Sequence, residues 1–122
     1  MTEAAGPASP LRALTAGAVL VQAVVLYLPS APGGVAFPGA DKVVHVLVFL
    51  VPVVLALLAG LPRWPVVAGS VVHAGVSEVL QWAVLSGRSG DPWDVVADLA
   101  GVGLGVALAR ALSASGPGRG RW

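Results

Sequence analysis

Ionisable side chains are scarce in this 122-residue chain, yet several of them recur at helical spacing. Asp41 and His45 are four residues apart, and so are Asp94 and Asp98. Residues at this spacing share one face of a helix, so each pair presents its side chains together. Carboxylates and imidazole bind protons, cations and hydrogen-bond donors, and they serve as general acids and bases. The candidate ligand-binding set comprises Asp41, Lys42, His45, Glu78, Gln81, Arg88, Asp94 and Asp98.

The strongest candidates for catalysis are the imidazole and the carboxylates expected inside the bundle, but each has a structural alternative. Asp94 can complement the positive N-terminus of a helix. Lys42 and Arg88 can extend to lipid headgroups. His45 can titrate, bind a metal, pair with Asp41 or hold a structural hydrogen bond. No known metal-site spacing is present, so we predict neither a metal nor a cofactor. The catalytic candidates are His45, Glu78, Asp94 and Asp98.

The composition is that of a membrane protein. Apolar residues make up 57% of the chain and charged residues 11%, with a mean hydropathy of +0.87. Soluble domains carry roughly 25% charged residues, more than twice the fraction found here. The net charge is +1 and the basic residues are dispersed, so nucleic-acid binding is not expected. Cysteine is absent, which excludes disulfides and thiolate metal sites.

Four apolar runs approach the roughly 20 residues that a spanning helix needs. The sequence therefore predicts an all-α, polytopic membrane protein, a bundle of about four transmembrane helices that fills residues 11–112. The segments 1–10 and 113–122 are expected to be flexible tails, the second of them basic. The predicted spans cover residues 11–28, 43–61, 65–85 and 95–112.

Orientation follows from the distribution of Lys and Arg, which favour the cytoplasmic side. In a four-span arrangement, five basic residues lie on one side and Lys42 and Arg88 on the other. We therefore expect both termini in the cytoplasm. The five residues on the cytoplasmic side are Arg12, Arg63, Arg110, Arg119 and Arg121.

An antiparallel bundle brings the start of the second span, the end of the third and the start of the fourth to its outer side. These are the segments that carry the candidate residues, so we expect one water-accessible polar pocket there. His73 and Ser77 alone are expected to extend it inward, and His73 is interpreted as structural. Gly101 and Gly105 are expected to pack against a neighbouring helix. Pro52 should bend the second span.

The polar segments are Asp41-Lys42-Val43-Val44-His45, then Glu78-Val79-Leu80-Gln81, and then Arg88, Asp94, Asp98, Gly101 and Gly105. Taken together, these segments resemble the VanZ-like family of small bacterial membrane proteins. The family is named for a member associated with low-level resistance to the glycopeptide teicoplanin. Asp98 departs from the family pattern, in which an Asn is common, and an added acid there could shift the pKa values of the pocket. The resemblance covers about half of the chain, from Asp41 to Gly105.

The resemblance implies a multi-pass protein of the bacterial cell membrane, without specifying a reaction. The first hypothesis is an outer pocket that recognises a lipid-linked, glycopeptide-related or peptidoglycan-related headgroup, with Lys42 and Arg88 contacting an anionic group. The alternatives are a membrane-embedded hydrolase or transferase acting on such a headgroup, or a small transport or proton-relay subunit. A purely structural polar layer is the fourth interpretation. The partners that the sequence predicts are the bilayer and such a ligand, with no nucleic acid, and the oligomeric state is left open.

Overall fold

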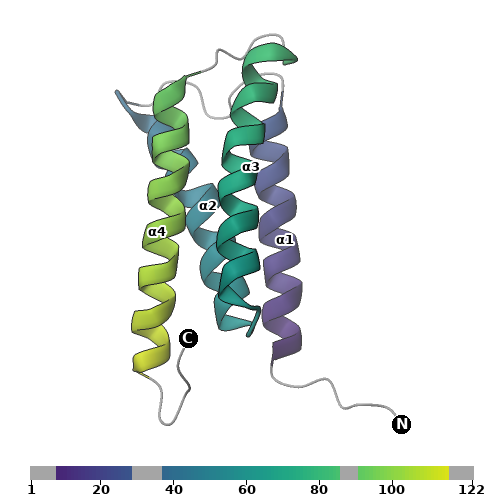
Figure 1. The fold of residues 1–122 in the computed structure, drawn as a ribbon, viewed down its shortest axis with the longest axis vertical. Helices are drawn as coiled ribbons and strands as arrows, with labels where there is room; N and C mark the ends of the chain where they lie inside the picture. The colour runs from purple at the N-terminus through teal and green to yellow at the C-terminus, as the bar shows by residue number, and fades with distance from the viewer. Residues whose placement is uncertain (1–7, 29–36, 86–90, 116–122) are drawn as a thin grey trace, which may run out of the picture.

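A computed structural model describes residues 8–28, 37–85 and 91–115 of the chain, and the prediction of an all-helical fold is confirmed for them (Figure 1). These residues contain no strand. The helices begin two or three residues before the predicted spans, because the residues that precede each apolar run also adopt helical conformation. The four helices are α1 (Ala8–Tyr27), α2 (Ala40–Leu58), α3 (Arg63–Ala83) and α4 (Pro92–Ala114).

The helices run alternately up and down, so the first residues of α1 and the last residues of α4 lie at the same end of the bundle (Figure 1). The ends of α1 and α3 and the starts of α2 and α4 lie at the opposite end, here called the site end. Three helices are long and apolar enough to cross a membrane: α1 from Pro10, α2 and α4. α3 has the necessary length at 21 residues, but its lower hydropathy keeps it outside that set.

α2 is the central helix and contacts all three others, most extensively α4 and then α1. Its residues Phe49, Val53 and Leu57 recur every four positions and are almost completely buried. This period places them on one helical stripe, which packs against Leu26 of α1, Ala74 of α3 and the inner face of α4. Burying such large apolar side chains fixes the position of α2 against the other helices.

α4 approaches α2 closely because glycines form the contact. A Cβ atom placed on Gly101 would collide with the backbone carbonyl oxygen of Val46. A Cβ atom on Gly105 would lie 3.0 Å from Val53 Cβ. Gly103, between them, has open space around it. The Gly-x-x-x-Gly spacing of Gly101 and Gly105 thus provides the smooth surface on which α2 rests.

A side chain from α1 compensates for the proline inside α2. Pro52 has no backbone N–H, so the carbonyl of Val48, four residues earlier, receives no helical hydrogen bond from it. Gln22 Nε2 donates a hydrogen bond to this carbonyl at 2.8 Å. Gln22 itself is 4% exposed, so a polar residue within an apolar run is explained by a backbone defect in the neighbouring helix.

Candidate functional site

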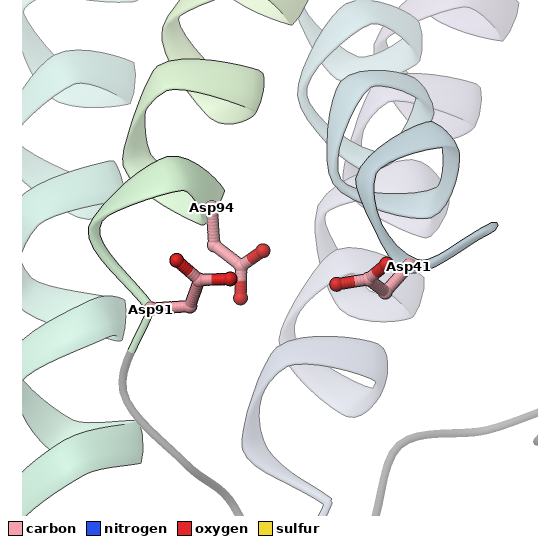
Figure 2. Close-up of side chains that lie close together, drawn as sticks. All are labelled: Asp41, Asp91 and Asp94. Carbon is pink, nitrogen blue, oxygen red and sulfur yellow. The ribbon is translucent and has the colours of Figure 1, made fainter. Parts of the chain in front are cut away.

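Lys42 occupies the centre of a cluster of three carboxylates at the site end. Its ammonium lies 2.6 Å from Asp41, 2.8 Å from Asp91 and 2.6 Å from Asp94. Figure 2 shows these three aspartates, with Asp91 and Asp94 at the start of α4 and Asp41 opposite them at the start of α2. An ammonium has three N–H donors, and here each one meets a carboxylate. Lys42 therefore links the first turns of α2 and α4.

Asp91 is the N-cap of α4, at the start of the sequence Asp-Pro-Trp-Asp. Its side chain accepts a hydrogen bond from the Trp93 backbone N–H at 3.0 Å, and Pro92 is the first helical residue. The Lys42 ammonium, together with this N–H, lowers the pKa of the Asp91 carboxyl group below its ordinary value. The backbone N–H of Asp91 in turn donates to Glu78 Oε1, which connects the start of α4 to α3.

Below this cluster, His45 lies between two carboxylates of α4. Its Nδ1 atom is 2.7 Å from Asp98 Oδ1, and its Nε2 atom is 3.5 Å from Asp94 Oδ2. His45 is 6% exposed and Asp98 is completely buried. Asp41, four residues before His45 on the same helix, bonds to Lys42 instead. Of the alternatives considered for His45, a pairing with Asp41 is therefore not observed, and His45 pairs with Asp94 and Asp98 of α4.

Two buried carboxylates in this region retain unused hydrogen-bonding capacity. Glu78 Oε2 and Asp98 Oδ2 are both buried, and neither has a hydrogen-bond partner among the described residues. Buried polar atoms in proteins are nearly always hydrogen-bonded, so two such oxygens in one cluster call for an explanation. A bound proton, water, cation or hydrogen-bond donor would satisfy them.

One of the predicted site residues, Gln81, stands apart from this cluster. Gln81 is buried, and its Nε2 atom donates to the Leu26 carbonyl at 2.8 Å, in the last turn of α1. The last carbonyls of a helix have no N–H donor within that helix, and Gln81 supplies one to the Leu26 carbonyl. Gln81 thereby joins α3 to α1. Arg88 falls outside the described residues.

The charges of the described cluster favour positive ligands over negative ones. Lys42 and His45 face the carboxyl groups of Asp41, Glu78, Asp91, Asp94 and Asp98. Oxygens of Asp41, Asp91 and Asp94 lie within 4.8 Å of one another, a spacing that suits a cation. The Lys42 ammonium contacts all three of these aspartates and provides that positive charge itself. A metal ion there would have to displace Lys42.

A second group of polar residues lies deeper in the bundle, where the sequence predicts an almost wholly apolar interior. A cavity of about 280 Å³ there is lined in part by Thr15 and Gln22 of α1 and by Ser70 and His73 of α3. His73 Nε2 lies 2.9 Å from the Tyr27 hydroxyl, which supports its structural interpretation. Thr15 and Gln22 were missed, although their separation of seven residues places them on one helical face. These groups give the proton-relay alternative more polar side chains than predicted.

Comparisons with known proteins leave the resemblance as the sole family indication. No protein-family model, curated protein sequence or solved structure matches this chain.

Proposed function

We propose that this chain is a VanZ-like protein of the bacterial cell membrane, whose site-end cluster recognises the headgroup of an envelope lipid or a glycopeptide-related molecule. The observation that carries the proposal is the pair of buried carboxylates, Glu78 and Asp98, each with an oxygen that has no partner among the described residues. Ionisable residues inside a membrane protein are costly and usually mark a functional site. A layer that only joined helices would satisfy its polar atoms internally.

The proposal includes α3 as a fourth span. The polar residues that lower its mean hydropathy face inward, since Ser77, Glu78 and Gln81 are all buried. The exposed face of α3 is apolar, with Val72 64% and Val79 60% exposed. Its 21 residues extend about 31 Å at 1.5 Å per residue, close to the thickness of the hydrocarbon core. Such a helix exposes apolar side chains to lipid, while its polar side chains face the other helices of the bundle.

The geometry changes the expected roles of the basic residues in this function. The Lys42 ammonium has all three donors engaged, so we assign it to holding α2 and α4 together rather than to contacting an anion. The described cluster then offers acceptors, and its ligand supplies hydrogen-bond donors. Arg88 stays the candidate for an anionic group on the same ligand.

Teicoplanin susceptibility tests the proposal in cells. We expect the chain, expressed in a sensitive bacterial host, to raise the minimal inhibitory concentration of teicoplanin. Glu78→Gln keeps the shape of the side chain and removes its charge, so it should abolish the increase at an unchanged protein level. Glu3→Gln makes the same chemical change elsewhere in the chain and should retain it. An increase that persists in Glu78→Gln would contradict the proposed role of the cluster.

The contact between His45 and Asp98 favours one alternative, a membrane-embedded hydrolase or transferase acting on the same headgroup. A carboxylate on Nδ1 orients an imidazole so that Nε2 can act as a general base. Here Nε2 faces Asp94 at 3.5 Å, within a region where His45 is almost fully buried. If His45→Gln removes the teicoplanin effect but leaves headgroup binding intact, the enzyme is favoured. If both persist, the binding role is favoured.

A further inference from the structure

A groove of about 500 Å³ lies between α3 and α4 next to the carboxylate cluster. This volume falls within the range of small-molecule sites, roughly 300–1,000 Å³. Glu78 and Asp91 also line the groove, which joins it to the site end. Its apolar walls are formed by Gly75, Val79 and Trp82 of α3 and by Pro92 and Val95 of α4.

The apolar part of the groove faces away from the bundle core. The side chains of Val79 and Trp82 are 60% and 73% exposed, so they present apolar surface at the outside of the helix pair. Gly75 has no side chain and open space around it, so the groove stays open at this position of α3. In a bilayer such a surface meets acyl or prenyl chains and not water.

The polar part of the groove is negatively charged. Glu78 is 8% exposed, its Oε1 atom accepts from the Asp91 backbone N–H, and its Oε2 atom has no partner among the described residues. Asp91 contacts Lys42, but Lys42 has no donor left for a ligand. An ammonium group complements this charge, and the attraction is stronger in an environment of low dielectric constant than in water.

We propose that this groove binds a membrane amphiphile with an amine-bearing headgroup, its hydrocarbon chain lying along Gly75 and Val79 and its ammonium group at Glu78. The inference rests on the headgroup site proposed above and names the class of molecule that the site takes. The ammonium lies beside the carboxylate of Glu78 and compensates its negative charge. The chain covers apolar surface between α3 and α4.

Fluorescence quenching of Trp82 tests this assignment directly. The full chain, purified in detergent with Trp64→Phe, Trp93→Phe and Trp122→Phe, retains Trp82 as its one tryptophan. We would titrate a brominated long-chain amine, with the alcohol and the sulfate of the same chain as matched probes. The amine should quench Trp82 with a midpoint about tenfold lower than the alcohol, equivalent to about 1.4 kcal/mol. Equal midpoints for the amine and the alcohol, or a lower midpoint for the sulfate, would overturn the amine assignment.

Two variants separate the groove from the headgroup site. Gly75→Leu fills the groove and should raise the midpoints of the amine and the alcohol about tenfold, or about 1.4 kcal/mol. Gly103→Leu adds the same side chain at an open position outside the groove and should change neither. Glu78→Gln should make the amine and alcohol midpoints equal. Circular dichroism and gel filtration check that each variant folds. The comparison of amine, alcohol and sulfate uses the chain with native Glu78 and Gly75, so it stays valid if a variant fails to fold.

The outcomes distinguish this inference from the proposed function. If Gly75→Leu has no effect while Glu78→Gln removes the preference for the amine, the groove is wrong and the headgroup site stands. If Gly75→Leu blocks quenching while Glu78→Gln keeps the preference, the assignment of the ammonium to Glu78 and its role in headgroup recognition are both wrong.

Discussion

Lys42 is the residue on which the arrangement of charges at the site end depends. Its ammonium separates three carboxylates that would otherwise repel one another across the start of α2 and α4. The side chain of Lys42 is 31% exposed and that of Asp94 is 10% exposed, so solvent screens the cluster only in part. The stabilisation it provides lies between that of surface ion pairs and that of buried ones.

Replacing Lys42 by methionine should therefore lower the free energy of unfolding by roughly 1–3 kcal/mol, since each lost hydrogen bond joined two charged groups. Thermal unfolding in detergent, followed by circular dichroism, measures the loss. We also expect Ca²⁺ to raise the melting temperature of Lys42→Met but not that of the wild-type protein. In the variant, the three carboxylates are free to take the cation.

The control for this prediction is Lys42→Arg, which keeps the positive charge and should lose less stability. A Lys42→Met protein as stable as the wild type would show that Lys42 does not hold the helices together. A wild-type protein stabilised as strongly by Ca²⁺ would show that the ion binds without displacing Lys42.

The hydrogen bond from Gln22 to Val48 depends on Pro52, and a double-mutant cycle can test the dependence. Gln22→Leu leaves the Val48 carbonyl without a donor, which should cost about 1–3 kcal/mol of stability. Pro52→Ala supplies the missing N–H from within α2. In the Pro52→Ala background, Gln22→Leu should therefore cost less than it does alone. Equal costs in both backgrounds, measured by denaturant unfolding in detergent, would contradict the compensation.

Sequence reasoning at this scale identifies residues better than it identifies partners. The cap formed by Asp91 was predictable because it needs only residues within one turn. The contact of His45 with Asp98 was not, because the two residues are 53 positions apart and the contact depends on the rotation and depth of α2 and α4. Glu78 accepts from a backbone N–H at the start of α4, a donor that side-chain types do not reveal.

At the scale of elements, the close approach of α2 and α4 depends on Gly101 and Gly105, which pack tightly against α2. Gly103, between them in the sequence, has open space around it. Gly101→Ala places a methyl group against the Val46 carbonyl and should cost about 1–3 kcal/mol, the usual range for overpacking. Gly103→Ala, at an open position of the same helix, should be neutral or slightly stabilising.

Denaturant unfolding of these two variants in detergent compares the same chemical change two residues apart. Equal stability of Gly101→Ala and Gly103→Ala would show that the α2–α4 contact relaxes easily, and that the small residues are not needed for it.

The mean hydropathy of α1, α2 and α4 marks them as possible spans but that of α3 does not, and the reason is the averaging over helical faces. A window over α3 mixes its buried Glu78 and Gln81 with its exposed valines, so the mean falls although the outer face is apolar. The same averaging hid Gln22 within α1. Faces become visible only when each helix is assigned neighbours, which a single sequence does not provide.

For the whole molecule, the all-helical fold followed from composition and the length of the apolar runs, which need no knowledge of contacts. The gathering of polar residues at one end followed from alternating helix direction (Figure 1). The inner cavity and the groove between α3 and α4 could not be derived, because both depend on which side chains leave space where helices meet.

We propose that the helices span the bacterial membrane with the site end facing outward, and cysteine labelling in intact cells tests this orientation most directly. The chain has no cysteine, so single substitutions act as clean probes. Val84, 68% exposed at the end of α3, reports on the site end, and Ser115, after α4, reports on the opposite end. We predict that an impermeant maleimide labels Val84→Cys in intact cells and Ser115→Cys only after permeabilisation. The reverse pattern, or labelling of both in intact cells, would contradict the claim.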